Sequence, residues 1–590
     1  MTPMTGTTRT DPITLELIQN ALVAVAEQMS VTVVRTARSS VSKEVMDFST
    51  ALCNERGELI AQGHCLPIML GSIPAAMQAL LSKFGDNTHP GDIFVMNDPY
   101  EGGSHLPDVF MFKPIYVGDA LIGYACVVTH QADIGGIAPG GISSQATEIF
   151  QEGLRIPLTK LFSKGLANEF LFELIARNVR VPDKVIGDLN SQISACAHGE
   201  NGLRRIVDEY GLETTRWHLE ALLDYSERRT RALFASLPDG DYTFRDSLDD
   251  DGKSPQPIPI AVTIRKLGST LTADFTGTAR QVKGAINMTK SDAISCVYFV
   301  ARCLLDADVP NNAGCFRPIH VVTQPGTIVD ALPPAAVASR VITSFRVVDT
   351  LFGALAQLCP DKVPACGMAA DCNVCISGMA PDGTPFVQLD WLPGSWGGRP
   401  GYDGIDHVSA LASNVSNTPV ELIEAESPLL IERYELVPDT GGPGTHRGGL
   451  SISRTWRLQG IDEALLQVRS DRVKFAPYGL SGGAPGTRGR NVLSTSDGER
   501  EMPSKFQVIL RSGDRIRLQT AGAGGWGDPR NRDLGLIKKD ISEGRVSQVT
   551  TGTAYPHAAR VSAMQSDETA TSEPATMGAE RTAGRGLHSR

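Results

Sequence analysis

Residues 91–130, GDIFVMNDPYEGGSHLPDVFMFKPIYVGDALIGYACVVTH, carry the pattern that decides the fold of this chain. Short apolar runs alternate with Gly, Pro and Asp, a pattern typical of strands joined by turns. The polar, Gly-rich segment 97–108 interrupts these runs. The stretch therefore predicts a strand meander with one long loop.

The segments around this meander switch between the periods of helices and strands. Helical spacing of apolar residues occurs in 13–37, 73–84, 166–235, 290–306 and 345–360. Strand patterns occur in 47–63, from 236 to about 285, and in 372–530, and 533–549 favours one short helix. The chain is therefore predicted to be a multidomain α+β protein with mixed sheets, helical segments and a β-rich C-terminal half.

Changes in these patterns predict five regions along the chain. They are an N-terminal α+β region (1–235) that contains the polar loop, a middle α+β region (236–371), a β-rich C-terminal region (372–532), a short helical extension (533–561) and a tail (562–590). The tail has no Ile, Val, Phe, Tyr or Trp, so we expect it to be disordered.

Composition excludes several classes of protein. The 590 residues include 55 Lys and Arg against 66 Asp and Glu, so an acidic chain without a basic stripe argues against a nucleic-acid partner. No stretch reaches the ~18 consecutive apolar residues of a membrane span, and the N-terminus lacks the apolar core of a secretory signal. The eleven Cys are scattered, which favours reduced thiols and a cytoplasmic location without membrane association.

Four short motifs resemble known sites but have the wrong context. Residues 522–527 fit GxGxxG, yet too little chain follows for a dinucleotide-binding unit. Residues 479–483 fit GxSxG without the helix that a nucleophile elbow requires, and 251–254 lack the first Gly of a phosphate-binding loop. Cys372 and Cys375 lie in a strand pattern, which sends their side chains to opposite faces. The chain therefore shows no ATP site of its own.

Metal-competent side chains are concentrated around the polar loop. His105 and Asp108 are three residues apart in a loop that can curl, His130 ends a predicted strand, and Asp47 precedes another. Imidazole and carboxylate groups suit Zn, Mn or Fe(II) rather than a structural thiolate site. Each residue can equally be a turn residue or a satisfied core residue, so both interpretations stay open at this point.

Two carboxylates, Glu44 and Asp133, flank these residues and are candidate catalytic residues. We expect at least one to accept the free ring N–H of a ligand histidine and so fix its tautomer. For Asp133, which precedes Ile-Gly-Gly, an ordinary turn carboxylate is the alternative.

Longer stretches make the chain similar to a known family. The main markers are EVMDFSTALCNERGELIAQG (44–63), GDIFVMNDPYEGGSHLPDVF (91–110), THQADIGG (129–136), PNNAGCFRPI (310–319) and NTPVELIEAESPLLIERYEL (417–436). The chain resembles the hydantoinase B/oxoprolinase B family, the beta-type subunits of ATP-dependent hydantoinases, oxoprolinases and related lactamases. It also resembles the large subunits of acetone- and acetophenone-type carboxylases. The resemblance extends from residue 11 to residue 529.

This resemblance implies that Asp47, His105, Asp108 and His130 bind one divalent transition metal, Zn or Mn and possibly Fe. It also implies a hydantoinase A-type partner that carries the ATP site, in a hetero-oligomer such as α2β2. The sequence departs from the family at Met69, where many relatives have a histidine.

The implied activity is the opening of a cyclic amide, such as a hydantoin, 5-oxoproline or lactam ring. The partner would phosphorylate the amide oxygen, and the metal site of this chain would then activate water for attack on the ring carbon. Two alternatives stay open, namely the large subunit of an acetone-type carboxylase and a non-catalytic scaffold.

Overall fold

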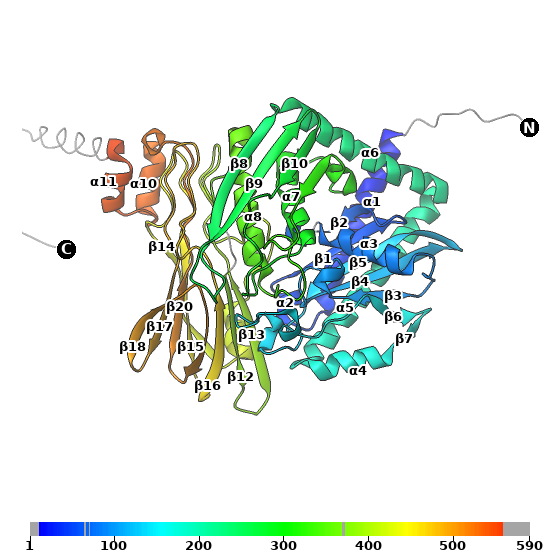
Figure 1. The fold of residues 1–590 in the computed structure, drawn as a ribbon, viewed down its shortest axis with the longest axis horizontal. Coiled ribbons are helices and arrows are strands. Elements are labelled where there is room, and N and C mark those ends of the chain that lie inside the picture. The colour runs from blue at the N-terminus through cyan, green and yellow to red at the C-terminus, as the bar shows by residue number, and fades with distance from the viewer. Residues whose placement is uncertain (1–10, 64–65, 70, 369–371, 559–590) are drawn as a thin grey trace, which may run out of the picture.

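A computed structural model of the chain describes residues 11–63, 66–69, 71–368 and 372–558 (Figure 1). The tail predicted to be disordered (562–590) lies outside these ranges. The described residues form four sheets with helices packed around two of them, so the predicted α+β class is confirmed. Each sheet falls within one of the predicted regions, although the region limits themselves stay a prediction.

The N-terminal sheet has seven strands in the order β2-β1-β5-β4-β3-β6-β7. Its strands are β1 Phe48–Asn54, β2 Leu59–Gln62, β3 Ile93–Met96, β4 Asp108–Val117, β5 Ala120–His130, β6 Thr159–Ser163 and β7 Leu166–Ala167. The predicted meander is confirmed as β3, β4 and β5, with the polar loop between β3 and β4. The register of the β4–β5 hairpin places Asp108 directly opposite His130.

Helices cover both faces of this sheet. They are α1 Pro12–Thr36, α2 Ser40–Lys43, α3 Ser72–Phe84, α4 Glu169–Asn178, α5 Pro182–Tyr210 and α6 Leu212–Ser236. Alternate residues of β4 enter different cores: Phe110 and Phe112 pack in the core that contains α3, and Met111 packs with α1 and α5. Because both faces are buried, the strand reads as a nearly continuous apolar run.

The middle sheet has the order β11-β10-β9-β8. Its strands are β8 Gly240–Leu248, β9 Ile258–Leu267, β10 Thr270–Asp274 and β11 Ile319–Val322, and its helices are α7 Lys290–Leu304 and α8 Arg340–Leu358. Helix α8 packs against β8, β9 and α7. Its apolar residues belong to the same core as α3 and β4, so the N-terminal and middle regions share one hydrophobic core.

The C-terminal region is a sandwich of two antiparallel sheets. One has the order β13-β12-β16-β19, and the other β14-β15-β20-β17-β18. The strands are β12 Cys372–Met379, β13 Pro385–Leu392, β14 Leu429–Val437, β15 Ser451–Leu458, β16 Glu463–Arg469, β17 Arg490–Thr495, β18 Gly498–Met502, β19 Lys505–Arg511 and β20 Arg515–Gln519. Ile376 and Leu466 of the first sheet and Trp456 and Leu518 of the second share one core, as expected for packed sheets.

Three short helices complete the C-terminal region: α9 Val420–Glu426, α10 Leu534–Ser542 and α11 Gln548–Ala554. The short helix predicted in 533–549 is present as α10, and a second helix that was not predicted, α11, follows it. Gly544 adopts a left-handed φ of 70° after α10, and the Ser547 side chain caps the start of α11.

The rejected motifs lie in packed loops and strands. A β-carbon on Gly524 would lie 2.0 Å from the Tyr478 carbonyl oxygen, so this glycine permits close packing of two loops. Cys372 and Cys375 lie on β12 and belong to different hydrophobic clusters, as their spacing predicts. The described structure therefore supports neither a dinucleotide site nor a CxxC metal site at these positions.

Two helices of the described structure, α1 and α8, are long and apolar enough for a membrane span by length and composition alone. Of the apolar window in α8, 83% is buried inside the protein, against 39% in α1. The burial of α8 is that of a core helix. Helix α1 packs one face, including Ile18, Leu22 and Met29, on the N-terminal core.

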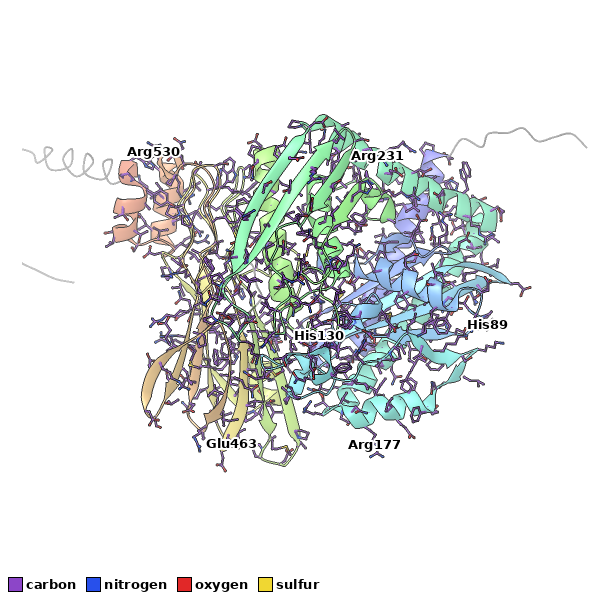
Figure 2. All side chains as sticks on the ribbon, viewed as in Figure 1. His89, His130, Arg177, Arg231, Glu463 and Arg530 are labelled. Carbon is purple, nitrogen blue, oxygen red and sulfur yellow. The ribbon has the colours of Figure 1, made fainter. Side chains whose placement is uncertain are left out.

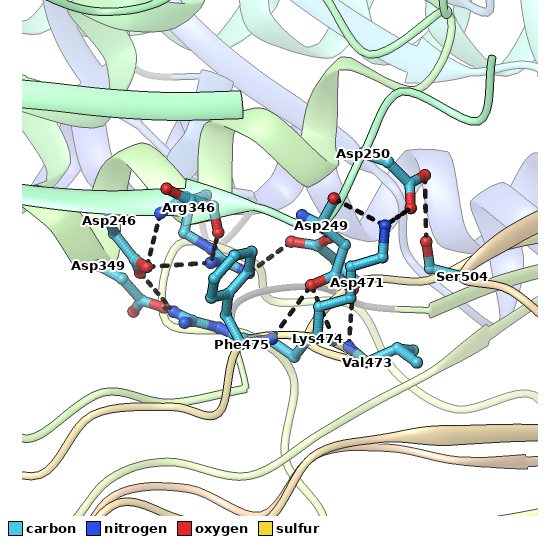
Figure 3. A network of polar contacts seen from close by, with 12 residues as sticks. Asp246, Asp249, Asp250, Arg346, Asp349, Asp471, Val473, Lys474, Phe475 and Ser504 are labelled. Atoms are coloured by element: carbon cyan, nitrogen blue, oxygen red, sulfur yellow. Dashed lines mark hydrogen bonds and ion pairs between the residues drawn. The ribbon is translucent and has the colours of Figure 1, made fainter. Parts of the chain in front are cut away.

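A network of buried charges joins α8 to the C-terminal region (Figure 3). Arg346 of α8 pairs with Asp471 and, at 3.2 Å, with Asp246 of β8. Asp349, one turn further along α8, pairs with Arg472 at 2.9 Å. Because these groups are almost fully buried, each charge depends on its partner for solvation.

We therefore predict that Arg346→Met destabilises the fold strongly. The substitution leaves Asp471 as a buried carboxylate without its guanidinium partner, which typically costs about 3–5 kcal/mol, whereas Asp246 keeps Arg472 at 3.0 Å. Thermal unfolding of R346M and of a control variant, followed by circular dichroism, would measure the loss of stability. Arg530→Met is the control because Arg530 pairs with Asp528 on the surface. Equal melting temperatures for R346M and R530M would contradict the assigned role of the network.

Candidate active site

The end of the N-terminal sheet brings together the four residues predicted to bind a metal. Asp108 begins β4 and His130 ends β5, and the two are paired across the hairpin. The backbone N–H of His130 donates to the carbonyl of Asp47 at 3.0 Å, which places Asp47 on the other side of β5. His105 lies in the loop before β4, with its ring centroid 5.0 Å from that of His130. All four line one cavity.

The loop that carries His105 is held from both ends. The Asn97 side chain donates to the carbonyls of Leu106 and Leu154 at 2.7 and 2.9 Å. The Asp98 carboxylate pairs with Arg155 at 2.7 Å. Gly102 has a φ of 102°, a conformation that favours glycine. The Asn97-Asp98 pair and the glycines therefore fix the path of this loop.

The N-terminal end of α8 forms the second wall of the cavity, through Ser339 and Arg340. The Arg340 guanidinium donates to Asp108 Oδ2 at 2.6 Å and lies 3.3 Å from Asp292 Oδ1. His105 Nδ1 contacts the same Asp108 oxygen at 2.8 Å, and the Ser104 hydroxyl donates to it. Oδ2 of Asp108 therefore has three partners, whereas Oδ1 is buried and has no hydrogen-bond partner among the described residues.

The third wall comes from the C-terminal region, so the cavity lies where the three regions meet. Trp391 of β13, Asn373 of β12 and Arg469 of β16 line it. The edge of the Trp391 ring packs against His130, with ring centroids 5.7 Å apart. Figure 2 shows His130 near the middle of the molecule, between the N-terminal sheet and the C-terminal strands.

The protonation states in the cavity follow from burial and from neighbouring charges. Burial lowers the pKa of His130 to about 3, with a further contribution from His105, and burial also lowers the pKa of His105. Burial alone would raise the pKa of Asp108, but His105 and Arg340 outweigh it and hold that pKa below its ordinary value. Two neutral imidazoles beside an ionised carboxylate are the forms that a metal-binding set requires.

The donor atoms fit a divalent transition metal in chemistry. His130 Nδ1 and Asp108 Oδ1 are both buried and have no hydrogen-bond partner in the described structure, and imidazole with carboxylate suits Zn, Mn or Fe. However, no three His, Cys, Asp or Glu side chains of the described residues already converge as a metal site. Binding would therefore require the side chains around Asp108 to turn toward a common centre, and the metal stays a prediction.

Glu44 and Asp133, the two candidate catalytic carboxylates, are not among the residues that line the cavity. The Asp133 carboxylate accepts from the backbone N–H of Gly140 at 2.9 Å and of Arg180 at 2.7 Å. It thus anchors the loop after β5, which favours the turn alternative. Glu44 caps the end of α2, is half-buried and is not among the residues that line the cavity. Met69, the departure from the family pattern, lines the cavity with an apolar side chain.

The cavity residues that were not anticipated from the sequence include Ser339, Arg340, Asn373, Trp391 and Arg469. Two of these residues, Arg340 and Arg469, could have been identified from the sequence. Arg340 follows the apolar run PAAVAS, and Arg469 ends the run ALLQV, so each places a charge inside a stretch that reads as core. A charge in such a position requires a buried partner or a ligand.

Comparisons with known proteins bear on this site. Residues 11–529 match the family described as Hydantoinase B/oxoprolinase. The chain belongs to this family. The B-type subunit of a putative D-/L-hydantoinase from Pseudomonas sp. (strain NS671) is 34% identical, with 91% of this chain and 93% of that protein covered. The beta subunit of caprolactamase from Pseudomonas jessenii is 32% identical, with 91% and 94% covered.

Two solved structures have the same fold. The crystal structure of ATP-dependent caprolactamase from Pseudomonas jessenii superimposes with a TM-score of 0.87 at 29% identity and covers 93% of this chain and 96% of its own. The nucleotide-free structure of acetone carboxylase superimposes with a TM-score of 0.86 at 17% identity and covers 96% of this chain and 84% of its own. The second likeness shows the fold alone.

A buried acid near α8 makes the stability of this family member depend on pH. Glu152 Oε1 accepts from the backbone N–H of Ala338 at 2.8 Å, just before α8. Burial raises the pKa of Glu152 from 4.5 to about 8, although the backbone donors of Ala338 and Val337 oppose the shift. The folded protein therefore retains a proton that the unfolded chain releases, and stability falls as pH rises from about 4.5 through 8.

We predict that Glu152→Gln reduces this loss of stability at high pH. The difference between the melting temperatures at pH 6 and pH 8.5 should be smaller in E152Q than in the wild type. Glu463→Gln, at an exposed position on β16, is the control and should leave the difference unchanged. An E152Q difference equal to that of the wild type would show that Glu152 is not protonated in the fold.

Proposed function

We propose that the chain is the ring-opening component of an ATP-dependent cyclic-amide hydrolase and acts on hydantoin, 5-oxoproline or lactam rings. The proposal is supported by its family and by relatives named as the B-type component of a hydantoinase and the beta component of caprolactamase. The observation that carries it is the cavity at the end of the N-terminal sheet, where Asp47, His105, Asp108 and His130 come together.

The proposed substrate is a cyclic amide whose oxygen has been phosphorylated by a hydantoinase A-type partner. An amide carbon is a poor electrophile, and phosphorylation converts the amide oxygen into one that can accept the electrons displaced by attack. The resulting imidophosphate and two water molecules give the ring-opened amino acid and inorganic phosphate. The bonds broken are the C=N bond of the ring and the linkage to phosphate, and the nitrogen takes up two protons from the two water molecules. For a hydantoin, the ring-opened product is the N-carbamoyl amino acid.

The side chains of the cavity would have separate tasks in this reaction. A divalent metal held by Asp47, His105, Asp108 and His130 would polarise the substrate and lower the pKa of water to near neutrality. Arg340 keeps Asp108 ionised, as the lowered pKa of that carboxyl indicates. Trp391 restricts the His130 ring by packing against it, and the apolar wall formed by Met69 and Ile142 excludes bulk water.

ATP would be used by the partner and not by this chain. The glycine-rich segments of the described structure are packed loops, as Gly524 illustrates. Because ATP use and ring opening would then lie on different chains, the proposed assembly is a hetero-oligomer such as α2β2, which we expect to be cytoplasmic. Because a labile phosphorylated intermediate must pass between subunits, we expect a stable interface that buries on the order of 2,000 Å² or more.

The large subunit of an acetone-type carboxylase is the second candidate, since the acetone carboxylase structure has the same fold. In that reaction, the same cavity would join a phosphorylated enolate to carbon dioxide. A third, small subunit in the purified complex and turnover of acetone with bicarbonate would favour the carboxylase. A two-subunit complex that turns over cyclic amides would favour the hydrolase.

One prediction of this proposal concerns the metal. The purified chain should carry about one divalent transition metal, because the donor set of the cavity suits one ion. His105→Ala and His130→Ala should each lose most of it while retaining the fold, as measured by elemental analysis and circular dichroism. His198→Ala, at an exposed position on α5, should retain the metal. Full occupancy in both H105A and H130A would rule out the assigned site.

The second prediction concerns the partner. The isolated chain should neither hydrolyse ATP nor open cyclic amides, because its sequence shows no phosphate-binding loop with which to phosphorylate the amide oxygen. Addition of the A-type partner should restore ring opening with ATP consumed in proportion. Ring opening by the isolated chain without ATP would contradict the division of labour. Separate elution of the two subunits on a sizing column would contradict the stable assembly.

A further inference from the structure

One row of side chains crosses the C-terminal sheet and faces the cavity. Trp391 on β13 is paired with Asn373 on β12, and Asn373 is paired with Arg469 on β16. Residues directly opposite one another on antiparallel strands point to the same face of the sheet. This register explains why all three line the cavity that His105 and His130 line from the other side.

Arg469 in this row is a buried cation without an anion. Its exposed fraction is 1%, and the only hydrogen bond of its side chain to a described residue runs from Nη2 to Asn373 Oδ1. Nε and Nη1 have no hydrogen-bond partner, and Arg469 forms no ion pair with any carboxylate in the described ranges. Desolvation without an anion lowers its pKa to about 10.

Other buried arginines of the chain are compensated. Arg454 pairs with Asp390 at 2.6 Å, and Arg472 pairs with Asp349 at 2.9 Å. Arg340, in the same cavity, is neutralised by Asp108 and Asp292. The guanidinium of Arg469, by contrast, lacks a negative partner among the described residues. Because an isolated buried charge strongly disfavours folding, we expect a bound anion to compensate it.

The N-terminus of α8 points to the same cavity. Ser339 occupies the N-cap position of this 19-residue helix, but its side chain makes no capping hydrogen bond. The cavity is lined by Ser339 and by Val341 and Ile342 of the first turn. The Ser339 hydroxyl is buried and has no hydrogen-bond partner among the described residues. The backbone N–H groups of Ser339, Arg340 and Ile342 already donate to carbonyls, whereas that of Val341 has no acceptor among the described residues. This N–H group and the dipole of the helix N-terminus favour an anion.

We propose that Arg469, Ser339 and the N-terminus of α8 form an oxyanion site that binds the phosphoryl group of the substrate. This inference rests on the proposed function for the source of the phosphoryl group. A planar carboxylate is satisfied by one guanidinium fork, whereas a phosphoryl group has three terminal oxygens and nearly two negative charges. The combination of a guanidinium, a hydroxyl and the Val341 N–H group at the start of α8 matches the phosphoryl group better. Because this oxyanion site lies in the same cavity as Asp108, His105 and His130, a phosphoryl group bound there would place the activated ring carbon near these three residues.

Binding of inorganic phosphate to the full chain tests the site directly. Isothermal titration calorimetry should show phosphate binding to the wild type, weakened at least tenfold by Arg469→Gln. Arg511→Gln is the matched control, because it removes one positive charge at an exposed position on the adjacent strand β19. It should change the affinity less than twofold. Acetate, titrated in parallel, should bind at least tenfold more weakly than phosphate.

Asn373→Asp supplies a second test that does not depend on loss of the guanidinium. The new carboxylate, opposite Arg469, would become its internal anion. The melting temperature should therefore rise, and phosphate should bind at least tenfold more weakly. A wild type that binds no phosphate, or R469Q and N373D variants that bind it as well as the wild type, would overturn the proposal. Acetate binding equal to that of phosphate would overturn the assignment to a phosphoryl group.

The two proposals fail separately in these measurements. Phosphate binding that depends on Arg469, in a chain whose complex opens no cyclic amide, would retain the oxyanion site and reject the hydrolase. Ring opening by the complex, with phosphate binding insensitive to R469Q and N373D, would retain the hydrolase and reject the oxyanion site.

Discussion

The salt bridge between Arg340 and Asp108 is the interaction on which the cavity depends. Arg340 lies between two buried carboxylates, Asp108 and Asp292. Burial raises the pKa of Asp292 to about 6, although Arg340 opposes the shift, so loss of the guanidinium would leave two acids that cannot both stay ionised. The bridge also joins residues 232 positions apart and thereby fixes the N-terminus of α8 against the end of the N-terminal sheet.

Helix α8 extends the same principle across the molecule. Arg340 at its start contacts the cavity, Arg346 further along contacts the C-terminal region and β8, and Asp349 contacts the loop after β16. Because a helix is rigid over this length, α8 keeps a fixed separation between the cavity wall at the end of the N-terminal sheet and the wall formed by the C-terminal region. A small apolar cluster that includes Ala338, Cys375 and Trp391 fills the junction.

Local sequence patterns were sufficient for the elements and for one wall of the site. The short apolar runs between Gly, Pro and Asp in 91–130 predicted the meander that contains the β4–β5 hairpin, whose register pairs Asp108 with His130. They were not sufficient for Arg340, Trp391 and Arg469, because strand order is not a local property. Strand β12 lies beside β16, and no periodicity in 372–530 specifies that neighbour. The roles expected of Glu44 and Asp133 came from proximity in sequence and stay predictions, while the structure shows that Asp133 anchors a loop through Gly140 and Arg180.

Rapid-quench analysis of a single turnover tests the central claim most directly, namely that this cavity opens a ring activated elsewhere. The measurement uses the complex of His130→Asn with the A-type partner, a cyclic amide and ATP, and follows ADP and ring-opened product separately. The account predicts about one equivalent of ADP per site with no ring-opened product, because phosphorylation precedes the step that needs His130. Equal loss of ADP and product, or undiminished product, would contradict it.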